Sequence, residues 1–501
     1  MSALATADLS SRAVARAESA VDRGNWFYPF IGCAALLICL LIANPFNEAG
    51  FNDDWSYARV AMKLAQTGRM QYNGWGSPIL LFQSFWAVPW IRAFGFSFPV
   101  LQASMIPVSL GFVLLVYATG RALGLSRELS AFASMATATS PMFLPLAASF
   151  MTEAPGCFFS MLCIYAAARS VQSEDSRIAA RWLWVLTAAG LAGGANRQVV
   201  WIAPITLIPY LCWQRRTNRK FRTHAVAAYA VSGAIILAIT HFLSQPYGPL
   251  ELSQKQRTWV LHHEWGSAAN LIGSLLLSCV ALSLPAYCCL ASIIRRKPFT
   301  WWLITIPAVV LLSFEGIVLT GFVAPYGNCI LSWIGIATEG QEWFGAKPAS
   351  LPPWIRIGLT AMVNVSVAAS IAWVVRNRRN FRGTAQGQLL AIFGIFTLGS
   401  IALMLPGAMV GLAFDRYMLP ILPLVMLAVL MQYAKHNRSI PVVAWGCLAV
   451  FAFYGITTTH DYAASLRARM AAASALQKGG ISRDRISAGF EYDGWTELER
   501  S

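Results

Sequence analysis

The chain has 501 residues, of which 57% are hydrophobic and only 12% are charged. Because a soluble domain carries roughly 25% charged residues, this composition excludes a soluble protein and predicts an all-α, polytopic integral membrane protein. The formal net charge of +16 comes from short basic clusters between apolar runs, a pattern that orients membrane spans and argues against a nucleic-acid partner.

Apolar runs long enough to cross a hydrocarbon core of about 30 Å recur along the whole chain. No small-residue cleavage site follows the first run, so we predict an uncleaved first span. The segment 182–213 is too long for one helix and contains Asn196 and Arg197, so we predict two short spans that meet at this polar break. The other predicted spans, which bring the total to about 13, are 26–44, 97–119, 129–148, 154–170, 224–243, 270–293, 300–323, 355–375, 387–410, 417–434 and 440–459.

The basic residues predict the orientation of these spans. If the N-terminus is cytoplasmic, every short inner loop carries at least two Lys or Arg residues, and the outer connections near Asn196 and Phe414 carry one each. The expected organisation is a cytoplasmic segment (1–25), a transmembrane domain (26–459) whose first outer loop is 45–96, and an outer C-terminal tail (460–501). The first part of that tail is typical of an amphipathic helix near the membrane.

The first outer loop begins with two adjacent carboxylates, Asp53 and Asp54, followed by an amphipathic pattern. Apolar residues recur at three- to four-residue spacing from Tyr57 onward, and Gly68 ends the pattern. This predicts a juxtamembrane helix of about 15 residues. One N-cap needs only one side chain, so we expect Asp54 or Asn52 to cap the helix and Asp53 to remain available for chemistry.

Three more polar groups fall at predicted outer ends of spans. Glu153 follows Thr152 in the first turn of a span. An acid at this position either interacts favourably with the helix dipole or takes part in a reaction. Asp415, Arg416 and Tyr417 open another span, although interfacial Arg and Tyr are also common anchors. Arg197 lies in the polar break, where a cation normally lines a protected cavity.

Other candidates are weaker. Glu315 is a carboxylate deep in an apolar run, which makes it a functional candidate, but a lone protonated Glu fits the pattern equally well. The ten cysteines fall mostly in apolar runs without a CxxC pair, and His262, His263 and Glu264 lack the helical spacing of a metalloprotease site. We therefore predict no metal-ligand set, and a divalent cation as cofactor remains open.

Five segments, in this order and on these sides of the membrane, resemble the GT-C membrane glycosyltransferases. The closest group is the family 39 type, which includes protein O-mannosyltransferases and the aminoarabinose transferase of lipid A. The segments are DDWSYARVAMKLAQTG, SPILLFQSFWAVPWIRAFGFS, ATGRALGLSRE, ATSPMFLPLAASFMTEAPG and DRYMLPILPL.

The resemblance implies roles for particular residues. The first acid of the family's first outer loop is the catalytic base, a role that falls to Asp53 with Asp54 in the second position, and the acid of the second outer loop matches Glu153. The chain departs from many relatives at Ser77-Pro78, where they have Lys-Pro and hence one more phosphate-binding cation.

The resemblance also implies a reaction: an inverting transfer of a sugar from a polyprenyl-phosphate donor to a lipid, glycan or protein acceptor. It would occur on the periplasmic face of a bacterial inner membrane, among membrane lipids, with the N-terminus cytoplasmic and the C-terminus periplasmic. Asp53 would accept the acceptor proton, and positive or polar groups would stabilise the phosphate. The expected substrate-binding residues are Asp54, Tyr57, Glu153, Arg197, Glu315, Asp415, Arg416 and Tyr417.

Two other functions compete with this one. A transporter or flippase for polyprenyl-linked saccharides would place its ionisable groups near the bilayer midplane, whereas most candidates here lie at the outer face. A polysaccharide polymerase or ligase would also use outer loops but would act on diphosphate-linked oligosaccharides.

Overall fold

The computed structural model describes residues 26–76, 78–243, 265–294, 324, 326–327, 329–331, 351–377, 384–436 and 439–500. Glu315, Ser77, the segment His262 to Glu264 and the predicted span 300–323 lie outside these residues. Within them the chain folds into helices joined by loops, and the described ranges contain no β-strand. The predicted all-α, polytopic membrane fold is confirmed.

The helices of the first half of the chain are α2 (Tyr28–Ala43), α3 (Asp54–Thr67), α4 (Leu81–Phe94), α5 (Phe98–Ala122), α6 (Arg127–Ala138), α7 (Phe143–Ala147), α8 (Glu153–Gln172), α9 (Ser176–Gly194), η1 (Gln198–Trp201), α10 (Ile202–Gln214) and α11 (Arg219–Leu243). Those of the second half are α13 (Trp265–Leu282), α14 (Leu284–Ile294), α16 (Pro353–Asn377), α17 (Ala385–Ala408), η3 (Asp415–Met418), α18 (Leu422–Ala434), α19 (Val442–Lys478), η4 (Arg483–Arg485) and α20 (Phe490–Arg500).

Six of the described helices are long and apolar enough to cross a membrane, or seven if the bent pair α13 and α14 forms one span. The shorter apolar helices α2 and α18 add two candidates. The chain is therefore a multi-pass membrane protein, and the expected number of 13 spans stays a prediction.

Two predicted single spans are broken, each next to a proline. The segment 129–148 forms α6 and α7, separated by a turn that contains Pro141. The segment 270–293 forms α13 and α14, which are bent by 63° next to Pro285. A proline disfavours helical geometry in the preceding residue and removes a backbone donor, so a continuous apolar run does not become a continuous helix. The predicted polar break between α9 and α10, by contrast, is confirmed.

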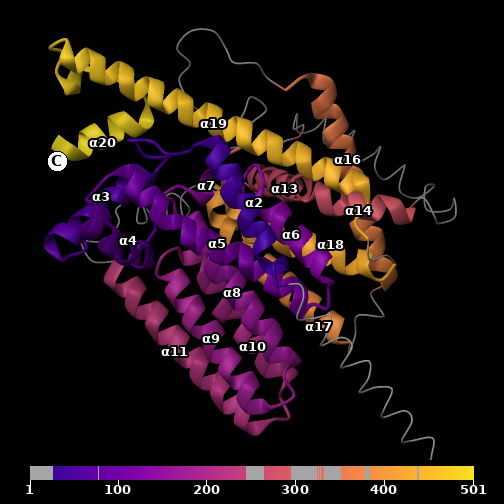
Figure 1. Cartoon of the computed structure of the whole chain (residues 1–501). Helices are drawn as coiled ribbons and strands as arrows, with labels where there is room; N and C mark the ends of the chain where they lie inside the picture. The colour runs from indigo at the N-terminus through magenta and orange to yellow at the C-terminus, as the bar shows by residue number, and fades with distance from the viewer. Residues whose placement is uncertain are drawn as a thin grey trace, which may run out of the picture.

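Helix α8 lies in the middle of the bundle. It packs against α5, α9, α10 and α17, and α9, α10 and α11 lie side by side next to it (Figure 1). Of its most apolar window, 72% is buried, the largest share among the candidate spans. The residue at its start, Glu153, is therefore enclosed by protein on several sides.

The C-terminal tail differs from its prediction. The last span and the expected separate amphipathic helix form one unbroken helix, α19, of 37 residues, which runs along one edge of the molecule (Figure 1). Its sequence after the apolar run is rich in Ala, Arg, Leu and Met, which favour helix over other structures. The chain then turns back through η4, and α20 packs on α3.

Candidate active site

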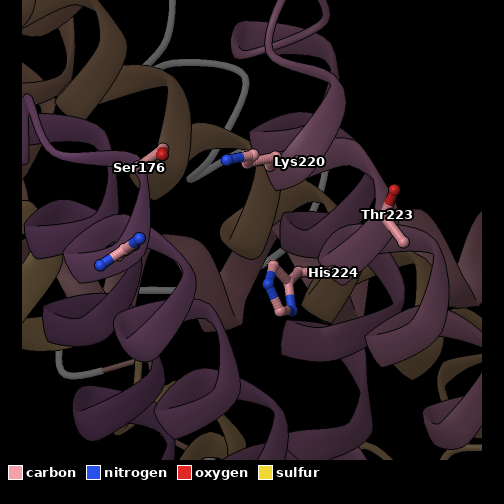
Figure 2. A pocket seen from close by; sticks show the side chains of 5 residues that line it. Ser176, Lys220, Thr223 and His224 are labelled. Atoms are coloured by element: carbon pink, nitrogen blue, oxygen red, sulfur yellow. The ribbon is translucent and has the colours of Figure 1, made fainter.

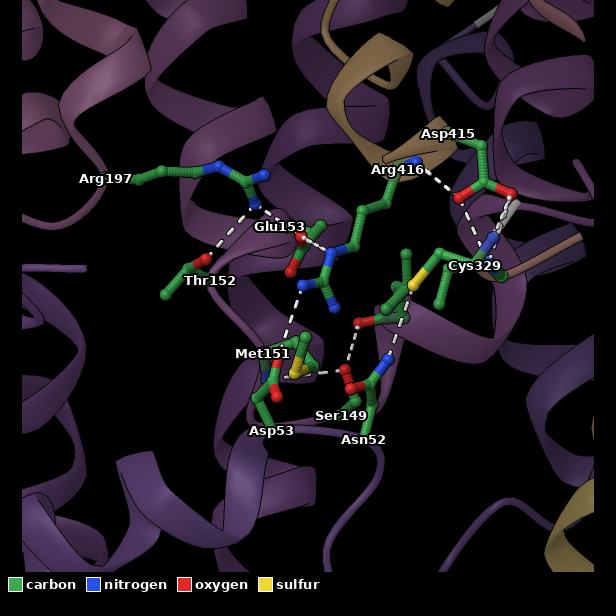
Figure 3. Close-up of polar contacts among 12 residues, drawn as sticks. Asn52, Asp53, Ser149, Met151, Thr152, Glu153, Arg197, Cys329, Asp415 and Arg416 are labelled. Carbon is green, nitrogen blue, oxygen red and sulfur yellow. Dashed lines mark hydrogen bonds and ion pairs between the residues drawn. The ribbon is translucent and has the colours of Figure 1, made fainter. Parts of the chain in front are cut away.

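Four charged residues from distant parts of the chain meet where several helices begin. Asp53 immediately precedes α3, Glu153 is the first residue of α8, Arg197 lies between α9 and η1, and Arg416 belongs to η3. Figure 3 shows their side chains pointing toward one another. Two carboxylates and two guanidiniums form a connected cluster, which we call the acid–arginine cluster.

Glu153 is the centre of this cluster. Its Oε1 lies 2.5 Å from Nη1 of Arg197 and 3.3 Å from Nε of Arg416. Arg197 also donates from Nη1 to the Thr152 hydroxyl, at 3.1 Å. Thr152 occupies the N-cap position of α8, but its side chain accepts no hydrogen bond from that helix. Because its hydroxyl holds Arg197, Thr152 supports the charge cluster and does not cap the helix.

Asp53 is the most accessible acid of the cluster. Its Oδ2 accepts a hydrogen bond from Nη2 of Arg416 at 3.0 Å, and its Oδ1 accepts one from Nε1 of Trp75 at 3.3 Å. Its side chain is 18% exposed, whereas that of Glu153 is 2% exposed. Asp53 does not cap α3 with its side chain. A carboxylate that is oriented by donors and yet reachable is suited to accept a proton from a substrate.

Two tyrosines line the cluster. The guanidinium carbon of Arg197 lies 4.8 Å from the ring centroid of Tyr417, and that of Arg416 lies 6.0 Å from it, within the range of cation–π attraction. Tyr57 is buried on α3. Burial and the neighbouring Asp53 carboxylate raise the pKa of Tyr57 well above its usual value, so its phenol is neutral and is a donor.

Arg416 is permanently charged, and only part of its hydrogen-bonding capacity is taken up by the neighbouring residues. Burial lowers the pKa of its guanidinium, but the neighbouring Glu153, Cys329 and Asp53 raise this pKa by more, and the net value lies well above the ordinary one. Within the described part of the chain, Nη1 of Arg416 and Oε2 of Glu153 are buried without a hydrogen-bond partner. A buried unsatisfied donor is costly, so these two atoms are available to a ligand.

Asp54 has a different environment from Asp53. It is fully buried, its Oδ1 accepts from the backbone N–H of Phe51 at 2.5 Å, and its Oδ2 accepts from that of Phe150 at 3.1 Å. The expectation that Asp54 or Asn52 caps α3 is therefore wrong: neither bonded N–H belongs to that helix, and the Asn52 amide donates to Cys329 Sγ. Asp54 instead ties the start of the first outer loop to the segment before α8.

Asp415 also binds backbone N–H groups. Its carboxylate accepts from the N–H groups of Cys329, Ile330 and Leu331 and from that of Arg416. Burial raises the pKa of Asp415 although these donors lower it. These contacts indicate that Asp415 positions Arg416. The expected contact between Asp415 and substrate stays a prediction.

The structure thus brings together Asp53, Tyr57, Glu153, Arg197, Arg416 and Tyr417. Trp75, which binds Asp53, could not be predicted from the sequence, since a single tryptophan in a polar loop has no pattern that distinguishes it from an interfacial anchor. Across the described ranges, no group of three or more His, Cys, Asp or Glu residues has the arrangement of a metal site.

A second polar feature lies far from this cluster. A pocket of about 310 Å³ is lined by Arg177 and by the residues labelled in Figure 2, namely Ser176, Lys220, Thr223 and His224. Glu153 begins α8 and Ser176 follows its end, so a helix of 20 residues, about 30 Å long, separates the two. Three of its five lining residues, Arg177, Lys220 and His224, are basic.

Fold and site together define a polytopic α-helical membrane protein with a buried charge cluster at one end of its bundle. Residues 86–243, which include Glu153 and Arg197, match the family described as dolichyl-phosphate-mannose-protein mannosyltransferase. Over this segment the predicted resemblance to the GT-C membrane glycosyltransferases is confirmed. No curated protein matches the chain.

Solved structures with a similar arrangement include two of ArnT from Cupriavidus metallidurans. The one bound to undecaprenyl phosphate has 12% identity and a TM-score of 0.45, over 90% of this chain and 72% of that chain. The apo structure has 13% identity and a TM-score of 0.36, over 88% and 79%. The apo oligosaccharyltransferase of Archaeoglobus fulgidus has 10% identity and a TM-score of 0.41, over 87% of this chain but only 56% of its own length.

Proposed function

We propose that the chain is an inverting glycosyltransferase that moves a sugar from a polyprenyl-phosphate donor to a hydroxyl of a lipid, glycan or protein acceptor. The observation that carries this proposal is the pairing of Asp53 with Arg416, whose Nη1 is buried and free for a ligand. The family match supports the donor class, since dolichyl phosphate mannose is a sugar linked to a polyprenyl phosphate.

The reaction needs one base and one anion site. The acceptor oxygen forms a bond to C1 of the sugar from the face opposite the phosphate. The bond between C1 and the phosphate oxygen breaks, and its electron pair leaves with the polyprenyl phosphate. The acceptor proton passes to the Asp53 carboxylate. Because the phosphate leaves as a stable anion, no second carboxylic acid is needed, unlike in glycoside hydrolysis.

The cluster has groups for each part of this reaction. Nη1 of Arg416, with Arg197 behind Glu153, would stabilise the charge that grows on the departing phosphate. The free Oε2 of Glu153 would accept a hydrogen bond from a hydroxyl of the sugar or acceptor. Asp53, the more exposed acid, would face the incoming acceptor.

The location of the cluster distinguishes this proposal from a transporter, and the released product distinguishes it from a polymerase or ligase. A transporter places ionisable groups near the middle of the bilayer, whereas the charges here gather where helices begin. The distribution of basic residues supports an outer location for this end; in the proposal it faces the periplasm of a bacterial inner membrane, and a lipid donor would enter it from the membrane. A polymerase or ligase would share the cluster but would release a polyprenyl diphosphate.

The test is a transfer assay with the purified full-length chain in lipid nanodiscs. A panel of polyprenyl-phosphate sugars is supplied with a lipid extract, glycans and peptides as acceptors, with and without Mg²⁺, and free polyprenyl phosphate is quantified. Release that depends on both donor and acceptor is expected. Release of a diphosphate from diphosphate-linked donors would favour a polymerase or ligase, and no release from any donor would contradict the proposal.

A further inference from the structure

A buried carboxylate on the C-terminal helix α20 forms a hydrogen bond and an ion pair with α19. Glu491, which is 3% exposed, accepts a hydrogen bond from the Tyr462 hydroxyl at 2.5 Å and pairs with Arg469 at 3.3 Å. Removing a buried carboxylate from two partners is unfavourable. The start of α20 is therefore held in place against α19.

The same helix packs closely on α3. A Cβ atom added to Gly494 would lie 2.5 Å from a ring carbon of Trp55, so the helix backbone touches the indole. The ring of Trp495 stacks on Phe96 at a centroid distance of 5.8 Å, and Arg59 donates to the carbonyl of Leu498 at 3.2 Å. Trp55 and Arg59 belong to α3, the helix that directly follows Asp53, whereas Phe96 lies between α4 and α5.

An aromatic cluster connects α20 to Asp53. The ring centroids of Phe490, Trp55 and Trp75 lie 5.4 to 5.7 Å from one another, a range in which aromatic pairs attract. Phe490 is the first residue of α20, and Trp75 donates its indole N–H to Oδ1 of Asp53. The chain end and the proposed base therefore contact the same side chain.

The loop that carries Trp75 is itself fixed to α3. Asn73 Oδ1 accepts from the Ser56 hydroxyl at 3.0 Å and from the Trp75 backbone N–H at 3.1 Å, and Asn73 Nδ2 donates to the Ser56 carbonyl. The backbone of Trp75 is thereby set by α3, while its ring is set by Phe490 and Trp55. Two independent sets of contacts determine where the indole N–H points.

We propose that Trp75 is a positioning residue for Asp53 and that α20 holds it in place through Phe490. The inference rests on the proposed function, because it assigns the C-terminal helix to the acceptor side of the same site. Arg416 and Trp75 each bind one oxygen of Asp53, which fixes the rotation of the carboxylate and leaves its remaining lone pairs to the acceptor hydroxyl. Asp54, Tyr57 and Cys329 also lie close enough to Asp53 to interact with its charge.

The first test is Trp75→Phe, which keeps an aromatic ring at this position and removes the indole N–H donor. Because the indole N–H and Arg416 together fix the rotation of the carboxylate, loss of the indole N–H lets Asp53 turn away from the acceptor hydroxyl. The kcat of sugar transfer is expected to fall about tenfold, with donor KM nearly unchanged. The matched control is Trp184→Phe on α9, whose indole N–H donates to His224 at 3.4 Å, and its kcat and donor KM are expected to match the wild type.

The second test is Phe490→Ala, which removes the ring from α20 without touching Asp53. It should lower kcat in the same way with donor KM nearly unchanged, and Phe490→Tyr should keep the wild-type kcat. A wild-type kcat in Trp75→Phe would overturn the role of Trp75, and a fall there without one in Phe490→Ala would overturn that of α20. Either result is distinct from failure of the proposed function, in which the wild type itself releases no polyprenyl phosphate from any donor.

Discussion

Asp53 and Arg416 are 363 residues apart in the chain, and Oδ2 of the first lies 3.0 Å from Nη2 of the second. The pair joins the start of α3 to η3 at one end of the bundle. Its geometry separates two tasks: the arginine holds a second donor, Nη1, free for an anion, and the carboxylate remains partly open.

The first prediction concerns this carboxylate. Asp53→Asn keeps the shape of the side chain but cannot accept a proton, so transfer should fall by a factor of about 10² to 10⁴. Measurement of polyprenyl phosphate release checks this, and size-exclusion chromatography shows that the variant still folds. Wild-type turnover by the variant would contradict the role of Asp53.

The second prediction concerns the arginine. Arg416→Lys keeps the charge but loses the planar fork that can bind Glu153, Asp53 and a phosphate at once. Donor affinity is expected to fall about tenfold or more, measured by calorimetry with a polyprenyl-phosphate sugar. The control is Arg121→Lys in the last turn of α5, and this variant should bind the donor with wild-type affinity. Equal affinities in both variants would make Arg416 a purely structural residue.

The third prediction concerns the docking of α20. Gly494→Ala places a methyl group against Trp55, and such overpacking costs about 1–3 kcal/mol. The C-terminal segment should then detach more often, and trypsin should cleave after Arg483 and Arg485 several times faster than in the wild type. Gly446→Ala, where a Cβ meets open space, should leave the cleavage rate unchanged.

The fourth prediction concerns pH. Burial raises the pKa of Asp54 well above its usual value, although the N–H groups of Phe150 and Phe51 lower it. The folded chain therefore keeps a proton that the unfolded chain has released. Between the unfolded pKa of about 3.9 and the raised folded one, each rise in pH weakens the folded state through Asp54.

This dependence can be measured against Asp54→Asn, which has no titratable group at the position. The difference in melting temperature between wild type and variant should be most favourable to the wild type near pH 4 and should shrink as the pH rises. A difference that grows with pH would show that Asp54 is ionised in the folded chain.

Much of the site could be predicted because its residues stand at the ends of apolar runs. The lengths of the runs place Asp53, Glu153 and Arg416 at the ends of predicted spans. The basic loops predict that these span ends lie on the same side of the membrane. The fold class follows from the same runs. Helix breaks at Pro141 and Pro285 lie inside apolar sequence, where hydropathy alone does not register them.

Contacts between distant segments could not be predicted. The capping rule considers only neighbouring residues, whereas Asp54 bonds to the backbone of Phe150, which is 96 residues away. The link between Trp75 and Phe490 joins two exposed aromatics with no periodic pattern. Nor does the end of an apolar run mark the end of a helix: the Ala-rich sequence after it keeps α19 helical as far as Lys478.

The length of α19 determines where α20, which follows its distal end, is positioned. A helix of 37 residues is about 55 Å long, nearly twice the thickness of a hydrocarbon core, so it carries the chain end out beyond the lipid as a stiff rod. Each residue of that rod turns everything after it by about 100°. One inserted residue near its outer half would thus rotate α20 away from α3, whereas seven would bring it back nearly into phase but about 10 Å farther out. The docking of the chain end is therefore set jointly by helical phase and by distance from the membrane.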